Sequence, residues 1–272
     1  MLSAFFLPAG SGQRFCIYHP GAREGATRGI VYAHPFCEEM NKARRMAALQ
    51  SRRLAAAGCA VLQIDLFGCG DSDGDLVDAT WETWRQDLRL ALGWLRSRVR
   101  GPLGLWGLRL GATLAADVAR DPALGLEQLV LWQPVVNGEL LLTQFLRLRL
   151  AAEMLADGAA QSGVRELRES LRGGAAQEIG GYDLHPRLAA DIDGLRLAEL
   201  LPAVQRAHWL EVAAVPDPKL SPASQRAAEA WRSKRLDVRT TAVQGEPFWS
   251  TLEIAECEAL LSATEASLEN VQ

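Results

Sequence analysis

The sequence lacks the features that mark membrane-spanning, secreted and nucleic-acid-binding proteins. No apolar run reaches the roughly 18 to 20 residues that a helix needs to cross a bilayer. Residues 1–10 contain neither a basic segment nor a long apolar one, so no signal peptide is predicted. The 29 lysines and arginines are outnumbered by 33 aspartates and glutamates, and the net charge of −4 leaves no basic surplus for a nucleic acid. We therefore expect a soluble protein with no nucleic-acid partner and no membrane span.

Cysteine and histidine are scarce as well. The five cysteines are odd in number and include no Cys-x-x-Cys pair, which favours free thiols in a reducing cytoplasm over a disulfide framework. None of the four histidines follows the last predicted strand, residues 238–243. His34, Cys37, Glu38 and Glu39 lie close together, but their spacing fits no metal site that we can identify. No metal and no cofactor is predicted.

Short apolar segments alternate with amphipathic ones along most of the 272 residues. After a leading hairpin at 5–7 and 15–18, we expect strands at 30–33, 60–64, 103–106, 129–132, 208–215 and 238–243. Helices are expected at 42–57, 80–98, 110–119, 222–234 and 252–268. Such alternation predicts the α/β class, with a doubly wound, mostly parallel sheet.

Residues 138–201 interrupt this regular pattern. They contain a helix rich in leucine and arginine at 140–155, a charged stretch at 164–171 and a glycine-rich link at Gly180 and Gly181. The segment is long for a connection between two strands. We expect it to form a helical cap between strands 6 and 7, over a core made of residues 1–137 and 202–272.

The most informative motif is Gly107-Leu108-Arg109-Leu110-Gly111. It has the spacing of the Gly-x-Ser-x-Gly elbow, a sharp turn from strand to helix that exposes a nucleophile above the sheet. The central residue here is an arginine. A guanidinium offers hydrogen-bond donors only and cannot attack a carbonyl carbon.

Four segments in this order resemble the α/β-hydrolase superfamily. They are residues 32–36 after the third strand, 65–74 after the fourth, the elbow, and 245–249 after the last strand, and together they cover roughly residues 30–260. A narrower resemblance is to the exosortase A system-associated hydrolases of the second type. It rests on HPFCEEMNK at 34–42, LWGLRLGA at 105–112 and GEPFW at 245–249.

The resemblance implies a role for each matching position. Arg109 occupies the place of the nucleophile, Asp217 that of the acid, and Glu246 that of the catalytic histidine. The oxyanion loop and pocket would be formed by His34, Pro35, Phe36, Leu110 and Trp249. The narrower group also implies a bacterial, cytoplasmic setting beside machinery for exopolysaccharide production and PEP-CTERM sorting.

Arg109 needs a partner, because a buried unpaired arginine would destabilise the fold by a free energy on the order of several kcal/mol. One hypothesis pairs it with Glu246 or Asp217, which would close the cleft. The other leaves it free for a carboxylate or phosphate, since it stands at a helix N-terminus that already favours anions. A ligand that displaces the carboxylate would reconcile the two.

Other nucleophiles are weaker candidates. Ser72 lies in a glycine-rich loop where a role in turn geometry is expected. Cys37 and Cys69 lie on loops that border the predicted cleft, and a thiol near Arg109 would have a lowered pKa. His34 is expected to hold its loop by hydrogen bonds to the backbone rather than to transfer protons.

Three functional hypotheses remain open from the sequence. In the first, the protein binds an anionic or acyl small molecule in a former active-site cleft and cleaves nothing. In the second, it is an ester or thioester hydrolase without a serine, with Glu246 or His34 as base and Arg109 as electrophile. The third, an assembly or regulatory component of polysaccharide machinery, rests on the resemblance alone.

Overall fold

The structure is a computed structural model that describes residues 2–22, 26–157 and 163–269. Residues 1, 23–25 and 270–272 of the predicted core and residues 158–162 of the predicted cap lie outside the described residues. The strands are β1 (Ser3–Pro8), β2 (Gln13–His19), β3 (Arg28–Ala33), β4 (Cys59–Ile64), β5 (Leu103–Leu108), β6 (Leu126–Trp132), β7 (Gln177–Ile179), β8 (Tyr182–Leu184), β9 (Arg206–Ala213) and β10 (Asp237–Gln244). The α-helices are α1 (Glu38–Ala56), α2 (Trp81–Arg96), α3 (Leu110–Val118), α4 (Gly138–Asp157), α5 (Val164–Arg172), α6 (Pro186–Asp193), α7 (Pro222–Ser233) and α8 (Glu258–Glu269).

An eight-stranded sheet forms the centre of the molecule, in the order β1-β2-β4-β3-β5-β6-β9-β10. The hairpin β1–β2 and the pair β2–β4 are antiparallel, and the remaining neighbours are parallel. The predicted doubly wound, mostly parallel sheet is confirmed.

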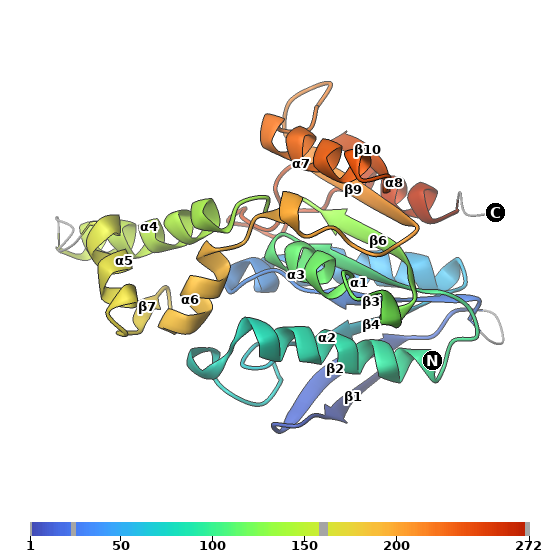
Figure 1. Cartoon of the computed structure of the whole chain (residues 1–272), viewed down its shortest axis with the longest axis horizontal. Coiled ribbons are helices and arrows are strands. Elements are labelled where there is room, and N and C mark those ends of the chain that lie inside the picture. Colours follow the sequence, from blue (N-terminus) through green and yellow to red (C-terminus); the bar gives the residue numbers. More distant parts are fainter. Residues whose placement is uncertain (1, 23–25, 158–162, 270–272) are drawn as a thin grey trace.

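Helices cover both faces of this sheet (Figure 1). One apolar cluster joins the sheet to α2, α3 and α7, and the other joins it to α1 and α8. Trp106 and Trp132 are fully buried in the second cluster and belong to the core. These two apolar clusters, one on each face of the sheet, hold the carboxyl ends of the parallel strands in place relative to one another.

The segment between β6 and β9 contains α4, α5, α6 and the small hairpin β7–β8, and it extends to one side of the sheet in Figure 1. It lies between the sixth and seventh strands of the main sheet, as expected, although the boundaries at 138 and 201 stay a prediction. Gly180 and Gly181 form the turn of the hairpin and not a plain link. Both have positive φ, of 59° and 85°, which is why glycine suits this turn.

Two helices begin four or more residues away from the predicted start. Helix α1 begins at Glu38, four residues before the predicted start, and α8 begins at Glu258, six residues after it. Thr80 caps α2 as expected, because its Oγ1 accepts a hydrogen bond from the Thr83 N–H at 3.0 Å. Within the described ranges, none of the helices combines the length and apolarity that crossing a bilayer requires.

Candidate functional site

Arg109 occupies a strained turn between β5 and α3. Its backbone angles are φ 55° and ψ −120°, a combination that is rare for residues with a side chain. A Cβ on Gly107 would come within 2.5 Å of Ala112, and one on Gly111 within 2.2 Å of the His34 carbonyl oxygen. The two glycines are therefore needed where they stand, and the turn has the geometry of a nucleophile elbow.

The guanidinium of Arg109 pairs with a carboxylate that the sequence analysis did not assign to it. Its Nε donates to Oε1 of Glu39 at 3.0 Å, and the two side chains are 18% and 22% exposed. The other oxygen, Glu39 Oε2, is enclosed and has no hydrogen-bond partner among the described residues. Burial raises the pKa of Glu39, and the neighbouring Arg109 offsets this only in part.

The expected pairing of Arg109 with Glu246 or Asp217 is therefore wrong. Both carboxylates are exposed, and Arg109 forms its ion pair with Glu39. The reason is the early start of α1, which brings Glu39 into the first helical turn beside the elbow. The signal in the sequence is the acidic pair Glu38-Glu39, a composition typical of the first turn of a helix.

His34 holds the loop before α1 and has no free ring nitrogen. Its Nε2 accepts a hydrogen bond from the Leu66 N–H at 3.1 Å, so the proton sits on Nδ1 and is donated to the Pro35 carbonyl oxygen at 2.7 Å. Burial lowers the pKa of His34 and favours this neutral form. The hypothesis of a backbone-holding histidine agrees with these contacts, and a general base at this position does not.

The alternative nucleophiles have structural roles or are protonated. The hydroxyl of Ser72 donates to the Asp65 carbonyl oxygen at 2.5 Å and accepts from the Phe15 N–H at 2.8 Å. Burial raises the pKa of Cys69 to about 12 and the pKa of Cys37 well above its ordinary value. The expected lowering of a thiol pKa by Arg109 is therefore wrong, because desolvation dominates.

A cavity of about 430 Å³ opens beside the elbow. The N-terminal part of α1, the side of α4 and the loop after β10 enclose it. Its lining residues are Phe36, Cys37, Glu38, Glu39, Lys42, Arg109, Leu141, Gln144, Phe145, Leu148, Trp249 and Ser250. Arg109 faces Trp249, with its Cζ 5.7 Å from the ring centroid. The cavity thus has a charged end at the elbow and an apolar wall on α4.

Of the predicted pocket residues, Phe36 and Trp249 line this cavity. Leu110, His34 and Pro35 instead line, with Phe36, a neighbouring internal space of about 10 Å³. A space of that size holds at most about one water molecule. Of the residues around this small space, Phe36 also lines the larger cavity, whereas His34, Pro35 and Leu110 do not.

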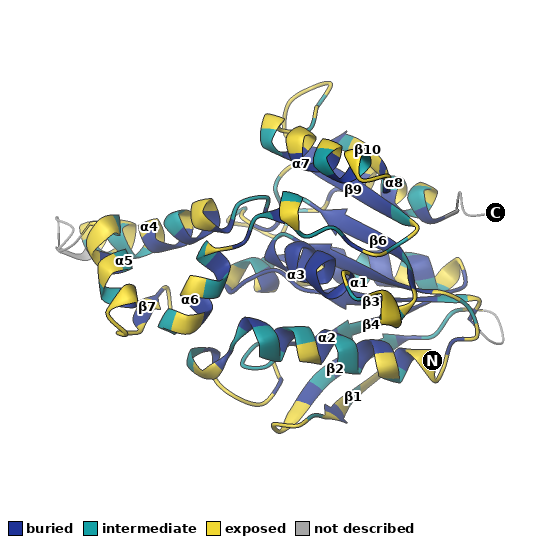
Figure 2. Ribbon diagram, in the orientation of Figure 1, coloured by how far each residue is buried: buried dark blue, intermediate teal, exposed yellow. Residues whose placement is uncertain are grey.

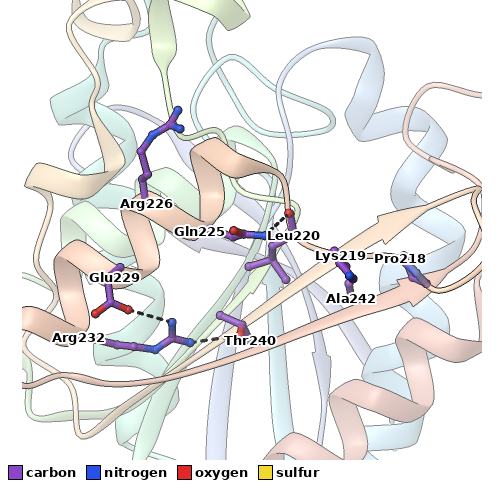
Figure 3. A pocket seen from close by; sticks show the side chains of 9 residues that line it. All are labelled: Pro218, Lys219, Leu220, Gln225, Arg226, Glu229, Arg232, Thr240 and Ala242. Atoms are coloured by element: carbon purple, nitrogen blue, oxygen red, sulfur yellow. Dashed lines mark hydrogen bonds and ion pairs between the residues drawn. The ribbon is translucent and has the colours of Figure 1, made fainter.

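Figure 3 shows a larger hollow, of about 640 Å³, against α7 and β10. Several of its polar side chains bond within the hollow. Arg232 donates to Oγ1 of Thr240 at 3.2 Å and pairs with Glu229 at 3.6 Å, while Gln225 donates to the Leu220 carbonyl oxygen at 2.9 Å. Arg109 is not among its lining residues, so the hollow is separate from the elbow.

No group of three or more histidine, cysteine or carboxylate side chains in the described part of the chain could hold a metal ion. Cys37, Glu38 and Glu39, which are consecutive in the sequence, therefore do not form such a group. The cavity presents charged side chains at the elbow and apolar side chains on α4.

The profile of the family described as "Serine aminopeptidase, S33" matches residues 26–207. A comparison with curated protein sequences finds no match.

Several solved structures are similar over nearly the whole chain. They include the esterase Est1E from Butyrivibrio proteoclasticus with bound ferulic acid, at a TM-score of 0.68 and 15% identity, covering 98% of this chain and 99% of that one. A thermostable carboxyl esterase from Bacillus coagulans has a TM-score of 0.68 at 12% identity, with 99% and 98% covered. Proline iminopeptidase from Mycobacterium smegmatis has a TM-score of 0.60 at 17% identity, with 98% of each chain covered. At these identities the likeness establishes the α/β-hydrolase fold.

Proposed function

This chain belongs to the serine aminopeptidase S33 family of α/β hydrolases, and we propose that it is a member that binds an anionic or acyl small molecule beside Arg109 without hydrolysing it. The observation that carries the proposal is the arginine on the strained elbow. At that position the side chain reaches the cavity, and it supplies positive charge where a hydrolase needs a nucleophile.

A proton acceptor is missing as well as a nucleophile. The last histidine in the sequence is His208, on β9, and no histidine follows β10. His34 uses both ring nitrogens within its own loop. Ser–His catalysis needs an imidazole within hydrogen-bond reach of the nucleophile. Two of the three parts of the triad are therefore absent.

The cavity offers each part of an amphiphilic anion a matching surface. Arg109 uses its Nε for Glu39, and its two terminal nitrogens are not used in that contact. A carboxylate, sulfonate or phosphate accepts from such nitrogens in charge-assisted hydrogen bonds. Leu141, Phe145 and Leu148 on α4 offer the apolar contact that a hydrocarbon tail requires.

Glu39 competes with such a ligand for Arg109. It lies in contact with the guanidinium, and its Oε2 is enclosed without a hydrogen-bond partner among the described residues. An incoming anion either takes the terminal nitrogens while Glu39 keeps Nε, or it displaces Glu39. In both cases the carboxylate of Glu39 opposes a second negative charge nearby.

The proposal is tested with octanesulfonate, a soluble anion with an apolar tail, by titration calorimetry. We expect Arg109→Gln to weaken binding by about tenfold or more, because a hydrogen bond to a charged group contributes about 1.5 to 3 kcal/mol. The matched control is Arg226→Gln, which removes an exposed arginine from the other hollow and leaves binding unchanged. Equal affinity in wild type and Arg109→Gln would refute the proposal.

The second candidate is a hydrolase that activates water without a serine. The two bases considered for it do not fit, since His34 is engaged and Glu246 is exposed and outside the cavity lining. The carboxylate that lies beside Arg109 is Glu39. We expect no labelling by a fluorophosphonate and no turnover of p-nitrophenyl esters. Turnover that is lost in Glu39→Gln would establish this second function instead.

The cellular setting is also part of the proposal. The motifs at 34–42, 105–112 and 245–249 resemble those of exosortase A system-associated hydrolases, and this supports a bacterial, cytoplasmic protein beside exopolysaccharide machinery. Loss of exopolysaccharide on deletion of the gene, restored by wild type and not by Arg109→Gln, is the expected result.

A further inference from the structure

The strand β10 forms one edge of the central sheet. It pairs with β9 over Asp237–Gln244, and none of the other described strands pairs with it. It contains no proline, whereas β1, the strand at the opposite edge, ends with Pro8. An edge strand directs unpaired backbone N–H and C=O groups outward, and an extended segment of another chain can bond to them.

Two contacts show which residues of β10 face outward. The N–H of Gly245, directly after β10, donates to a carbonyl oxygen of β9 at 3.0 Å, so the odd-numbered residues direct their backbone groups inward. The Val238 carbonyl oxygen instead accepts from Arg232 Nε of α7 at 3.0 Å. Backbone groups alternate between the two edges along a strand. Thr240 and Ala242 therefore direct their N–H and C=O groups to the open edge.

The hollow of about 640 Å³ lies against this open edge. Thr240 and Ala242 line it, and Figure 3 shows Arg232 reaching from α7 to Thr240. Side chains alternate between the two faces of a strand, and here Val238 packs in the cluster with α7 while Val243 packs in the one with α8. A strand added beside β10 therefore places every second side chain over the hollow.

The walls of the hollow are basic. Lys219, Arg226 and Arg232 line it together with a single acid, Glu229. Arg232 pairs with Glu229 at 3.6 Å, whereas none of the ion pairs of the described residues includes Lys219 or Arg226. The whole stretch 206–244, from β9 to β10, has a net charge of +3, since it holds seven arginines and lysines against four aspartates and glutamates. The chain as a whole has a net charge of −4, so this region is the one that favours acidic side chains.

We propose that the open edge of β10 binds an extended acidic segment of another protein, which adds to the eight-stranded sheet as a ninth strand. The outward backbone groups of Thr240 and Ala242 bond to the segment, and its carboxylates lie over Lys219 and Arg226. Binding of this kind draws affinity from main-chain hydrogen bonds and specificity from alternate side chains. Figure 2 shows exposed residues along α7, the helix beside which the segment lies.

Neither a second copy nor a simple polyanion matches both features of this edge. Two copies that paired through β10 across a two-fold axis would bring two basic hollows side by side, and like charges in close approach are unfavourable. A polyanion without amide groups matches the charge but makes no use of the alternating donors and acceptors of Thr240 and Ala242. An acidic strand matches the charge and bonds to the backbone.

Fluorescence anisotropy of a labelled peptide tests the proposal on the full chain. The probe is Thr-Glu-Val-Glu-Val-Glu-Thr with both ends blocked, and we expect wild type to bind it and not its counterpart with lysine in place of glutamate. Two further peptides carry methyl groups on the amide nitrogens of the glutamates or of the valines. One of these two should bind at least about tenfold more weakly than the other, because only one alternate set of amides faces β10.

The contribution of charge is tested by removing the two cations that form no ion pair. Lys219→Gln combined with Arg226→Gln should weaken binding of the acidic peptide by about fivefold or more. The matched control combines Arg172→Gln with Arg187→Gln, which removes two exposed arginines from α5 and α6, outside the hollow. The control should bind the peptide like wild type.

The proposal is overturned if wild type does not bind the acidic peptide, or if the two methylated peptides bind equally well, which would indicate attraction to a polyanion and not strand addition. It is also overturned if the control variant loses as much binding as the Lys219 and Arg226 variant. A dimer of the free chain that Ala242→Pro dissociates would show that a second copy occupies the edge instead. Octanesulfonate binding beside Arg109 is measured separately, so each of these outcomes leaves the proposed function standing.

Discussion

The backbone of Arg109 has the strained conformation of a nucleophile elbow, but its guanidinium cannot attack a carbonyl carbon. A non-glycine residue in this conformation destabilises the fold by about 1 to 3 kcal/mol, and it persists only where its surroundings enforce it. Here Gly107 and Gly111 allow close packing on both sides, and the Arg109 N–H donates to the Trp132 carbonyl oxygen at 2.9 Å. The turn thus holds the guanidinium at the cavity, against Glu39.

Glu39 makes anion binding depend on pH in a direction that follows from its pKa. Because burial raises this pKa, the carboxyl takes up a proton at a higher pH than an exposed glutamate does. Protonation removes the negative charge that competes for Arg109. Octanesulfonate stays ionised, so we expect its affinity to increase several-fold between about pH 8 and about pH 5.

Calorimetric titrations of wild type and Glu39→Gln across this range check the effect. Glutamine keeps the shape and an acceptor for Arg109 but carries no charge. The variant should bind as tightly at high pH as at low pH. A wild-type affinity that does not change with pH would show that Glu39 does not oppose the ligand.

At the scale of elements, the ends of helices determine what reaches the site. The first turn of α1 carries Glu38 and Glu39 to the cavity, while Cys37 precedes it with φ 50° and ψ −127°. Tyr182 on β8 connects the cap to this turn, since its hydroxyl donates to Glu38 Oε2 at 3.3 Å and accepts from Asn41 Nδ2 at 3.2 Å. The start of α1 therefore contacts both the elbow and the cap.

The residues that follow the C-terminal end of α7 include one whose backbone conformation favours glycine, so its replacement should change the stability of the fold. The Leu236 N–H bonds to the Trp231 carbonyl oxygen at 3.3 Å and the Arg235 N–H to that of Arg232 at 2.8 Å, which is a Schellman motif. Arg235 has a φ of 68°, where glycine is favoured. We expect Arg235→Gly to raise the free energy of unfolding by about 1 kcal/mol.

Urea unfolding measures this change. Lys234→Gly is the control, because Lys234 has a φ of −94° and gains nothing from glycine. Equal or lower stability of Arg235→Gly would contradict the expected relief of strain.

At the scale of the whole molecule, a buried ion pair connects the leading hairpin to the α/β layers. Arg14 on β2 donates to Asp87 Oδ1 on α2 at 2.7 Å, and both side chains are almost fully buried. The Phe67 N–H, from the loop after β4, donates to the other oxygen of Asp87 at 2.7 Å. One carboxylate thus joins three separate parts of the chain.

Asp87→Asn should therefore lower the free energy of unfolding by about 3 to 5 kcal/mol, because it leaves Arg14 buried without its counter-charge. Denaturant unfolding measures the loss. Asp75→Asn changes an exposed aspartate in the preceding loop and should leave stability within about 0.5 kcal/mol of wild type. A mild effect at Asp87 would mean that Arg14 reaches water or another acceptor after the substitution.

Local patterns in the sequence determined the fold class, the interruption of the sheet pattern after residue 137, and the elbow with its arginine. The periodicity of strands and helices and the spacing of the two glycines depend only on neighbouring residues. The absence of a histidine after the last strand is likewise a property of the sequence alone, so all three can be recognised from the sequence. The starts of α1 and α8 were exceptions, since the pattern predicts them at residues 42 and 252 and they lie at Glu38 and Glu258.

The tertiary structure alone decided which groups meet at the site. Arg109 and Glu39 are 70 residues apart in the chain, and no local rule selects Glu39 over Glu246 or Asp217. The same holds for His34, whose ring is engaged by Leu66, and for Cys37 and Cys69, whose thiols are held protonated by burial. Ion pairs, tautomers and pKa values depend on distance and desolvation in three dimensions, and these become defined only when the layers pack.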